Sequence, residues 1–308
     1  MYVPCKLRYC GTIVRNIHVV RTIDEFRKIR SSAGLKQLGF VPTMGALHDG
    51  HVSLMERARR ETDIVVASIF VNPTQFSAGE DLDKYPRTFD ADMQIMEAAG
   101  VDFVFAPNLD EIYKRNTLCH VEPSDFSNIS EGKARPDFFR GVATIVSKLF
   151  NIVQPSIAYF GQKDISQCIL VKRMVEDLNF PVEIKISKTL RLPSGLAMSS
   201  RNTYLQPSER EVASILYFAL ESARAKFDSA DGGGIRREDL VKCVLDILQS
   251  KPEVTQVEYI SVASHLDMKE LPVIDSRGAV ISSAIRLGSV RLIDNVLIGN
   301  ASNDILGR

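Results

Sequence analysis

Residues 64–71 (IVVASIFV) form an unbroken apolar run rich in β-branched side chains. Such a run is typical of a strand that is buried on both faces of a parallel sheet. A second apolar run lies at residues 38–41, and residues 51–61 between the two runs have the pattern of a helix. Strand, helix and strand in this order predict a right-handed βαβ unit, so we expect helices on both faces of the sheet.

The alternation of strands and helices continues along the first part of the chain. The further predicted elements are a helix at 91–99 ended by Gly100, a strand at 101–105, a helix at 141–153 ended by Pro155, a strand at 157–160, a helix to about Leu178 and a strand at 182–190. This pattern predicts a doubly wound α/β sheet, and we assign residues 1–189 to a Rossmann-like domain.

The pattern changes after Thr189. Two helices are expected there, a long one at 208–227 after Pro207 and another at 236–248, with Gly232, Gly233 and Gly234 as a flexible break between them. Three strands without intervening helices then follow at 254–262, 279–286 and 290–297. We therefore expect residues 190–308 to form a smaller α+β domain.

Composition excludes several classes of protein. Lys and Arg (38) balance Asp and Glu (38), so no basic surplus indicates a nucleic-acid partner. No apolar run is long enough to span a membrane, and the N-terminus lacks the apolar stretch of a secretory signal. The five cysteines are scattered without a C-x-x-C pair, which argues against a disulfide framework or structural zinc and favours a reducing compartment.

The segment PTMGALHDGH (residues 42–51) is the strongest functional signal. It places His48 and His51 between a predicted strand and a predicted helix, with Gly45 and Gly50 allowing close approach of the backbone to a ligand. A helix N-terminus has free N–H groups and partial positive charge, so the segment predicts a phosphate site. The alternative is a turn with two solvated histidines, which we disfavour because two of the chain's five histidines lie here. Asp49 is expected to cap the helix.

Two further polar segments follow predicted strands. FVNPTQF (70–76) carries Asn72 and Gln75, whose neutral amides suit the hydroxyls and carboxylate of a small substrate; a simple proline turn is an equally good interpretation of this segment alone. GQKD (161–164) carries Lys163, a natural phosphate ligand, with Gln167 one helical turn further on. Without the histidine segment, Lys163 would be interpreted as a solvated surface lysine.

The segment GLAMSSRN (195–202) places two hydroxyls and a guanidinium in a row, which can wrap a polyphosphate, although a serine-rich loop before a helix is the alternative. No P-loop, dinucleotide-binding or hydrolase-elbow motif is present. Acidic residues such as Asp92 could coordinate a magnesium ion. The alternative is that they belong to ordinary acidic surface turns, which are common. Met93, Met96 and Cys168 are expected in the core.

Together, PTMGALHDGH, FVNPTQF, the G-x-K-D segment and GLAMSSRN closely resemble the pantothenate synthetases (pantoate–β-alanine ligases) of the HxGH nucleotidyltransferase superfamily. The similarity also includes DLDKYPRTF (81–89), residues 135–150 and RLIDN (291–295). The resemblance implies an ATP-dependent condensation of pantoate with β-alanine through a pantoyl adenylate, releasing pyrophosphate and AMP. It also implies a cytoplasmic homodimer with Mg²⁺, with ATP as co-substrate and no tightly bound organic cofactor.

The resemblance also assigns roles to residues. Catalytic roles fall to His51, His48 and Lys163, and pantoate and β-alanine binding to Gln75, Gln167 and, close by, Asn72. Asp92 is the one position that matches a magnesium ligand. The residues expected to border ATP are Met44, Gly45, Ala46, Leu47, His48, Asp49, Gly50, His51, Gly161, Gln162, Lys163, Asp164, Leu190, Met198, Ser199, Ser200 and Arg201.

Several positions depart from the usual pattern of the family. Gln162 stands in place of a glutamate, Ser166 in place of a glutamine and Phe138 in place of a frequent histidine, while Leu192-Pro193-Ser194 replace acidic residues. These changes bear on the magnesium ligands and on the motion of the second domain, which would close over the site and shield the adenylate from water.

Two other functions compete with the ligase. A nucleotidyltransferase acting on a phosphorylated substrate would need a second cluster of cationic residues to bind the substrate phosphate. Gln75 and Gln167 are neutral, which favours a substrate with carboxylate and hydroxyl groups. A non-catalytic binding protein on the same fold would be expected to lose His48, His51 or Lys163, yet all three are present.

Overall fold

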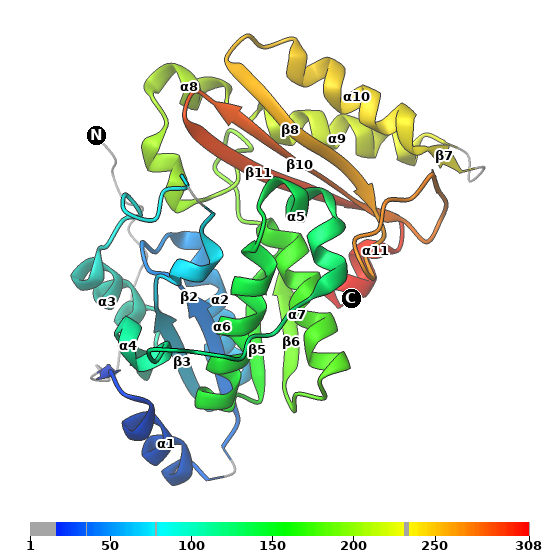
Figure 1. Ribbon diagram of the computed structural model, residues 1–308. Helices are drawn as coiled ribbons and strands as arrows, with labels where there is room; N and C mark the ends of the chain where they lie inside the picture. Colours follow the sequence, from blue (N-terminus) through cyan, green and yellow to red (C-terminus); the bar gives the residue numbers. More distant parts are fainter. Residues whose placement is uncertain (1–16, 35, 78, 231–233, 308) are drawn as a thin grey trace.

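The computed structural model describes residues 17–34, 36–77, 79–230 and 234–307, and Figure 1 shows two main sheets with their helices. Cys5, Cys10, Gly232 and Gly233 lie outside the described residues, as does the N-terminal stretch in which a secretory signal was not expected. Within the described part of the chain, no helix is both long and apolar enough to cross a membrane.

The first sheet has six strands in the order β1-β4-β3-β2-β5-β6, and every pair is parallel. It confirms the predicted doubly wound α/β fold. The strands are β1 (His18–Val20), β2 (Leu38–Thr43), β3 (Ile64–Ile69), β4 (Phe103–Phe105), β5 (Ile157–Gly161) and β6 (Glu183–Ser187).

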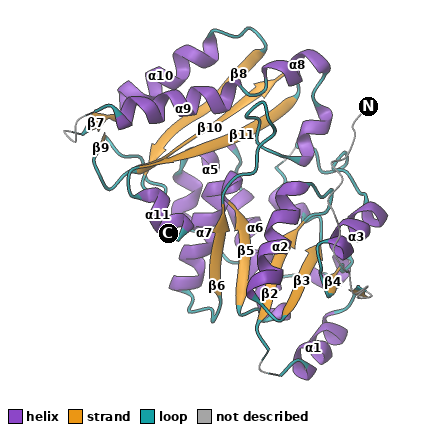
Figure 2. Ribbon diagram, turned by 180° about the vertical axis from the view of Figure 1, so that it is seen from behind, coloured by secondary structure: helices purple, strands orange, loops and turns teal. Residues whose placement is uncertain are grey.

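Helices cover both faces of this sheet, as the apolar run of β3 predicts. Val65 and Ala67 belong to the core cluster of α2 and α3, whereas Val66 belongs to the cluster of α6 and α7. Figure 2 shows α2 and α3 on the side toward the viewer. The helices that flank the sheet are α1 (Ile23–Ser32), α2 (Asp49–Glu61), α3 (Phe89–Ala98), α6 (Phe138–Val153) and α7 (Ile165–Asp177).

The second sheet is antiparallel, in the order β11-β10-β8, and lies beyond the carboxyl ends of β5 and β6 (Figure 2). One of its faces packs on α9 and α10 around a separate apolar cluster. This arrangement of helices and an antiparallel sheet confirms the smaller α+β part of the predicted fold. Its elements are α8 (Pro207–Val212), α9 (Ile215–Asp228), β7 (Ile235–Arg236), α10 (Arg237–Gln249), β8 (Val254–Ala263), β9 (Val273–Ile274), β10 (Ala279–Leu287), β11 (Val290–Ile298) and α11 (Ala301–Leu306).

Three predicted elements differ from the structure, and β1 and α1 were not predicted. The helix expected at 141–153 begins earlier, at Phe138. The helix expected at 208–227 is broken into α8 and α9 at Ala213 and Ser214, which keep right-handed helical dihedrals and so leave no mark in the sequence pattern. The break lets α9 bury Leu216 and Leu220, while α8 buries none of its residues. The strand expected at 182–190 ends at Ser187, and residues 188–190 line a cleft instead.

Short helices complete the chain. They are α4 (Leu109–Ile112), α5 (Ser130–Ala134) and the 3₁₀ turns η1 (Pro73–Gln75), η2 (Ser124–Asn128), η3 (Gln162–Asp164) and η4 (Ser200–Tyr204).

The order of the first sheet reverses between β2 and β5. From β2 the chain crosses to β3 on one side, and from β5 it crosses to β6 on the other. In open α/β sheets, ligands bind in the crevice at the carboxyl ends of two such strands. The histidine segment follows β2 and the GQKD segment follows β5, so the fold brings the two predicted phosphate sites together.

Close packing of α6 against η1 sets the position of Gln75. A Cβ at Gly141 would lie 2.3 Å from the carbonyl oxygen of Thr74 and 2.7 Å from the backbone nitrogen of Gln75. We expect Gly141→Ala to lower the free energy of unfolding by about 1–3 kcal/mol through overpacking, measured by urea denaturation. Gly161→Ala is the control because a Cβ there would meet nothing within 4 Å. Equal effects of the two substitutions would contradict this account.

Candidate active site

The histidine loop after β2 is held by a carboxylate of α3. Asp92 accepts hydrogen bonds from the backbone N–H of Ala46 (3.0 Å) and Leu47 (2.8 Å) and from the Thr88 hydroxyl (3.2 Å), and it is only 2% exposed. Gly45 (φ 81°) and Ala46 (φ 51°) both have left-handed backbone conformations. Asp92 therefore fixes a sharply bent loop that delivers His48 to the start of α2.

The two histidines cap α2 reciprocally. The Nδ1 atom of His48 accepts from the Gly50 N–H (3.2 Å), and the Nδ1 atom of His51 accepts from the His48 N–H (3.3 Å). The ring centroids lie 4.1 Å apart. His48 is the N-cap, so the prediction that Asp49 caps this helix is wrong: Asp49 is the first residue of α2 and is exposed.

These contacts fix the protonation of both rings. A nitrogen that accepts a hydrogen bond carries no proton, so each neutral ring carries its proton on Nε2. Burial, followed by the charge of Lys163, lowers the pKa of His48 to about 4. Burial, followed by His48 and Lys163, lowers the pKa of His51 to about 3. At neutral pH both histidines are therefore uncharged N–H donors.

Lys163 lies in η3, directly after β5. Its Nζ atom is 3.7 Å from the Asp164 carboxylate, and its side chain is one-fifth exposed. The neighbouring Cys168, buried as predicted, donates to the Gly161 carbonyl oxygen. Gln167 follows on α7 and lines the same cleft as Lys163. The strand-to-helix junction thus places one ammonium group across from the two imidazoles.

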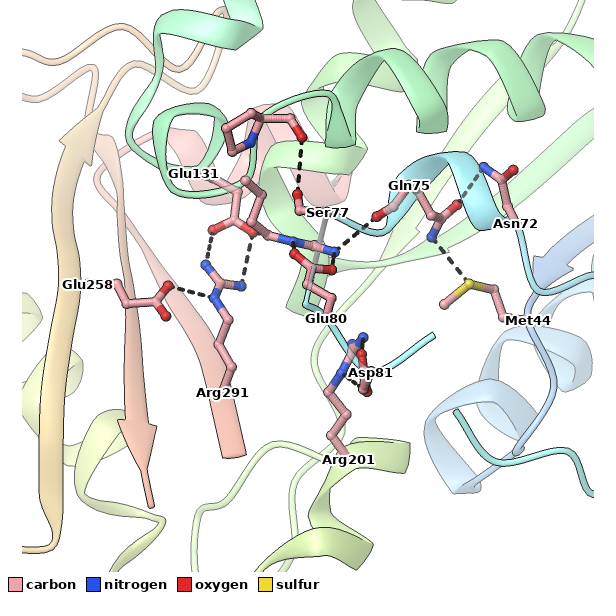
Figure 3. A network of polar contacts seen from close by, with 12 residues as sticks. Met44, Asn72, Gln75, Ser77, Glu80, Asp81, Glu131, Arg201, Glu258 and Arg291 are labelled. Atoms are coloured by element: carbon pink, nitrogen blue, oxygen red, sulfur yellow. Dashed lines mark hydrogen bonds and ion pairs between the residues drawn. The ribbon is translucent and has the colours of Figure 1, made fainter. Parts of the chain in front are cut away.

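Gln75 lies in a set of neutral hydrogen bonds, shown in Figure 3. Its Nε2 atom contacts the sulfur of Met44 (3.2 Å), and its Oε1 atom accepts from Asn72 (3.1 Å). Asn72 is 1% exposed, and its other contacts are Tyr113, Thr74 and the Gly141 carbonyl oxygen. Asn72 therefore orients Gln75.

The segment predicted to wrap a polyphosphate lies across the cleft at η4. Arg201 forms a bidentate ion pair with Asp81 (2.8 and 2.9 Å), and the Ser200 hydroxyl lies 3.4 Å from the Tyr85 hydroxyl. Burial alone would raise the pKa of Asp81, but the hydrogen bonds and the charge of Arg201, together with the charge of Arg135, hold that pKa below its usual value. In Figure 3 the ion pair of Arg201 and Asp81 lies near Glu80.

A cleft of about 220 Å³ joins these segments. Its wall has donors suited to a polyphosphate on one side and neutral amides suited to hydroxyl and carboxylate groups on the other. The predicted site residues that line it are Met44, His48, Gly50, His51, Asn72, Gln75, Gly161, Lys163, Asp164, Gln167, Leu190, Met198, Ser199, Ser200 and Arg201.

Six predicted residues do not line this cleft: Gly45, Ala46, Leu47, Asp49, Asp92 and Gln162. Gln162 is buried, and its amide donates to Asn295 on β11 (3.0 Å). Asp92 is buried in its contacts with the loop, and these contacts account for its charge without a metal. Among the described residues, no three His, Cys, Asp or Glu side chains converge as a metal site would require.

About half of the residues that line the cleft were not predicted, and three of these carry polar side chains with informative surroundings. Thr189 has a buried hydroxyl without a hydrogen-bond partner in the described part of the chain. Tyr85 comes from the segment DLDKYPRTF, to which no role was given. Arg135 pairs with Glu80 (2.7 and 2.8 Å) and donates to the Gln75 carbonyl oxygen (3.1 Å). Only the tertiary structure reveals these partners.

An ion-pair chain links this region to the second sheet (Figure 3). Glu131 of α5 accepts a bidentate pair of hydrogen bonds from Arg291 of β11 (2.7 and 3.1 Å), and Arg291 also pairs with Glu258 of β8 (2.7 Å). Arg135 lies 3.7 Å from the same Glu131. The backbone that carries Gln75 is therefore linked to the second sheet.

Comparison with known proteins gives one consistent result. The sequence profile of the family described as Pantoate-beta-alanine ligase matches residues 18–297. A pantothenate synthetase of Chloroflexus aggregans is 48% identical over 92% of this chain and 100% of its own length, and one of Herpetosiphon aurantiacus is 44% identical over 92% and 100%.

Solved structures agree with the sequence comparisons. The crystal structure of pantothenate synthetase from Thermus thermophilus has a TM-score of 0.84 and 41% identity, covering 92% of this chain and 99% of that one. The pantoate-beta-alanine ligase from Francisella tularensis, described as complexed with beta-gamma ATP and beta-alanine, has a TM-score of 0.73 and 36% identity, covering 91% and 97%.

The lowered histidine pKa values make stability depend on pH. Below the ordinary value of 6.5 the unfolded chain binds protons that the folded state rejects, so stability falls as pH drops from 6.5 toward the folded values of about 4 and 3. We expect His51→Gln, which can keep the capping contact, to reduce this loss by roughly 1–2 kcal/mol at about pH 5. Urea denaturation at a series of pH values from neutral downward measures it. Parallel pH profiles of the two proteins would contradict the buried neutral histidine.

Proposed function

The chain belongs to the pantoate-beta-alanine ligase family, and from this premise we propose that it condenses pantoate with β-alanine, using ATP, through a pantoyl adenylate. One observation supports the proposal most strongly. Hydrogen-bond donors suited to phosphate and neutral amides line the same cleft, which lies where the strand order of the first sheet reverses. The complex named for the relative from Francisella tularensis agrees with the proposed substrates.

The phosphates of ATP would lie between the two strand-end loops. The Nε2–H groups of His48 and His51 donate from one side without adding charge, and Lys163 supplies positive charge from the other. Ser199, Ser200 and Arg201 would bind from the opposite wall. We propose that Met44, Gly50, Gly161, Asp164, Leu190 and Met198, which also line the cleft, border the nucleotide.

Gln75 and Gln167 would bind pantoate. Both carry amides that donate and accept, which matches a molecule with hydroxyl groups and a carboxylate. Asn72, which is buried and holds the Gln75 amide, would act by orienting that side chain. The amine of β-alanine would arrive near Gln75.

The proposed chemistry has two displacements. A carboxylate oxygen of pantoate attacks the α-phosphorus of ATP. The bond between the α-phosphorus and the oxygen that bridges it to the β-phosphorus breaks, and pyrophosphate leaves. The β-alanine amine then attacks the acyl carbon, the bond to the AMP oxygen breaks, and the amine proton passes to solvent. The donors around the phosphates stabilise the charge that develops on the oxygens in the first step.

Magnesium has no suitable protein ligand at the predicted position. Both oxygens of Asp92 already accept hydrogen bonds from the loop and from Thr88, so Asp92 does not fit the role.

We also propose that residues 1–189 and 190–308 act as two domains, the second closing as a lid over the cleft. The separate apolar cluster between α9, α10 and one face of the second sheet supports this division. The other face packs through Ala263, Val280 and Leu297 into the cluster of α6 and α7, so the closing motion would involve α8, α9 and the loops before them rather than this contact.

A cytoplasmic location is proposed as well, supported by the free thiols of Cys119, Cys168 and Cys243.

The reaction can be tested by product release. We expect the wild type to release pyrophosphate from ATP only with pantoate, and AMP only when β-alanine is added. Lys163→Ala should slow pyrophosphate release about 10²–10³-fold because one charged donor is lost, and His51→Ala should be similarly slow. Lys172→Ala, which removes a partly exposed lysine of α7 outside the cleft, should retain wild-type rates.

The alternatives give different results in the same assay. Pyrophosphate release that is indifferent to pantoate would overturn the ligase and indicate another acceptor for AMP. Nucleotide binding without any turnover would instead indicate a binding protein.

The family resemblance also implies a homodimer. We expect light scattering after size-exclusion chromatography to give about twice the chain mass of 34.3 kDa at micromolar concentration. A mass of one chain at that concentration would contradict the dimer.

A further inference from the structure

One strand of the second sheet contacts both walls of the proposed phosphate site. Asp294 and Asn295 are consecutive residues of β11, so their side chains point to opposite sides of the strand. Asn295 contacts the turn that carries Lys163, whereas Asp294 contacts the loop that leads to Ser199 and Arg201. Neither side chain lines the cleft itself.

Asn295 uses its whole amide on the Lys163 turn. Its Nδ2 atom donates to the carbonyl oxygens of Gln162 (2.9 Å) and Lys163 (3.0 Å), and its Oδ1 atom accepts from the Gln162 amide (3.0 Å). Asn295 is 1% exposed, and Gln162 is also buried. The side chain therefore fixes the backbone at the point where Lys163 begins.

Asp294 contacts the loop that leads to Ser199 and Arg201 through an ion pair with Arg191. The two side chains form a bidentate ion pair (2.5 and 2.9 Å), and Asp294 is 4% exposed. Arg191 lies over the Tyr217 ring at 3.8 Å and donates to the Gly195 carbonyl oxygen (3.2 Å). Residues 191–197 form a turn, and an isolated antiparallel β-bridge between Arg191 and Ala197 closes it. Met198 follows directly.

The two contacts are joined on the strand, because the Asn295 N–H donates to the Asp294 carboxylate (2.8 Å). We propose that Asp294 and Asn295 are positioning residues that set the Lys163 turn against the loop bearing Ser199 and Arg201. This inference rests on the proposed function, in which both groups bind ATP phosphates. A buried polar network with every member paired has one low-energy arrangement, so it can hold two loops in register.

Asn295→Asp tests this role with little change in size. A carboxylate cannot donate, so both carbonyl oxygens lose their partner while the volume of the side chain stays. We expect the rate of pyrophosphate release to fall about 10–100-fold, as when a residue that orients a functional group is lost, with the KM for pantoate within about twofold of wild type. Asn300→Asp, the same change at an exposed position, is the matched control.

A positioning role also predicts that the effect passes through Lys163. In a Lys163→Ala background, Asn295→Asp should slow pyrophosphate release by less than about twofold further, because the group that it positions is gone. A purely structural role would lower the melting temperature and leave the rate per folded molecule unchanged. That result, or fully additive losses in the double variant, would overturn the proposal.

A second variant covers the case in which Asn295→Asp does not fold. Gln162→Met removes the amide that donates to Asn295 and keeps the two backbone contacts, so we expect a smaller loss of rate, of roughly 3–10-fold. A rate equal to wild type in this folded variant would then overturn the proposal. An inactive wild type would overturn the proposed function, whereas an active wild type with unaffected variants would overturn only the positioning role.

Discussion

The parallel pairing of β2 with β5 is the constraint on which the rest of the structure depends. Gly39 pairs with Ile157 and Phe40 with Ala158, which makes neighbours of two strands whose crossovers leave in opposite directions. Glycine at position 39 lets the end of α2 and the Tyr159 ring of β5 pack closely on β2, since a Cβ there would lie 2.6 Å from the Thr62 hydroxyl and 3.2 Å from that ring. The histidine loop and the Lys163 turn face each other because these two strands end side by side.

The electrostatics of the site follow from that arrangement. The imidazoles are buried beside an ammonium group, so they remain neutral and present N–H donors. Arg201 and Arg135 are paired with Asp81 and Glu80, and none of these pairs is fully exposed to water. A polyphosphate would therefore compete with Asp81 for Arg201, which links nucleotide binding to the position of the segment that carries Asp81 and Tyr85.

Sequence alone predicted five of the six strands of the first sheet and about half of the residues that line the cleft, because both depend on local signals. The apolar run of β3 requires cover on both faces, and glycines, histidines and a lysine after strands mark the ligand edge. The helix break at Ala213 could not be predicted, since both turn residues keep helical dihedrals. Other features depend on three-dimensional contacts, which no sequence periodicity encodes. They are the capping of α2 by His48 instead of Asp49, the support of the histidine loop by Asp92, and the pairing of Asn295 with Gln162.

The central claim is that the cleft at the reversal of the sheet joins a carboxylate to the α-phosphate of ATP. The most direct test uses pantoate labelled with ¹⁸O in its carboxylate and follows the label into products by mass spectrometry. The account predicts that one labelled oxygen leaves in AMP, since the bond from the acyl carbon to that oxygen breaks when β-alanine attacks. Label in inorganic phosphate with formation of ADP, or no label in any phosphate product, would contradict it.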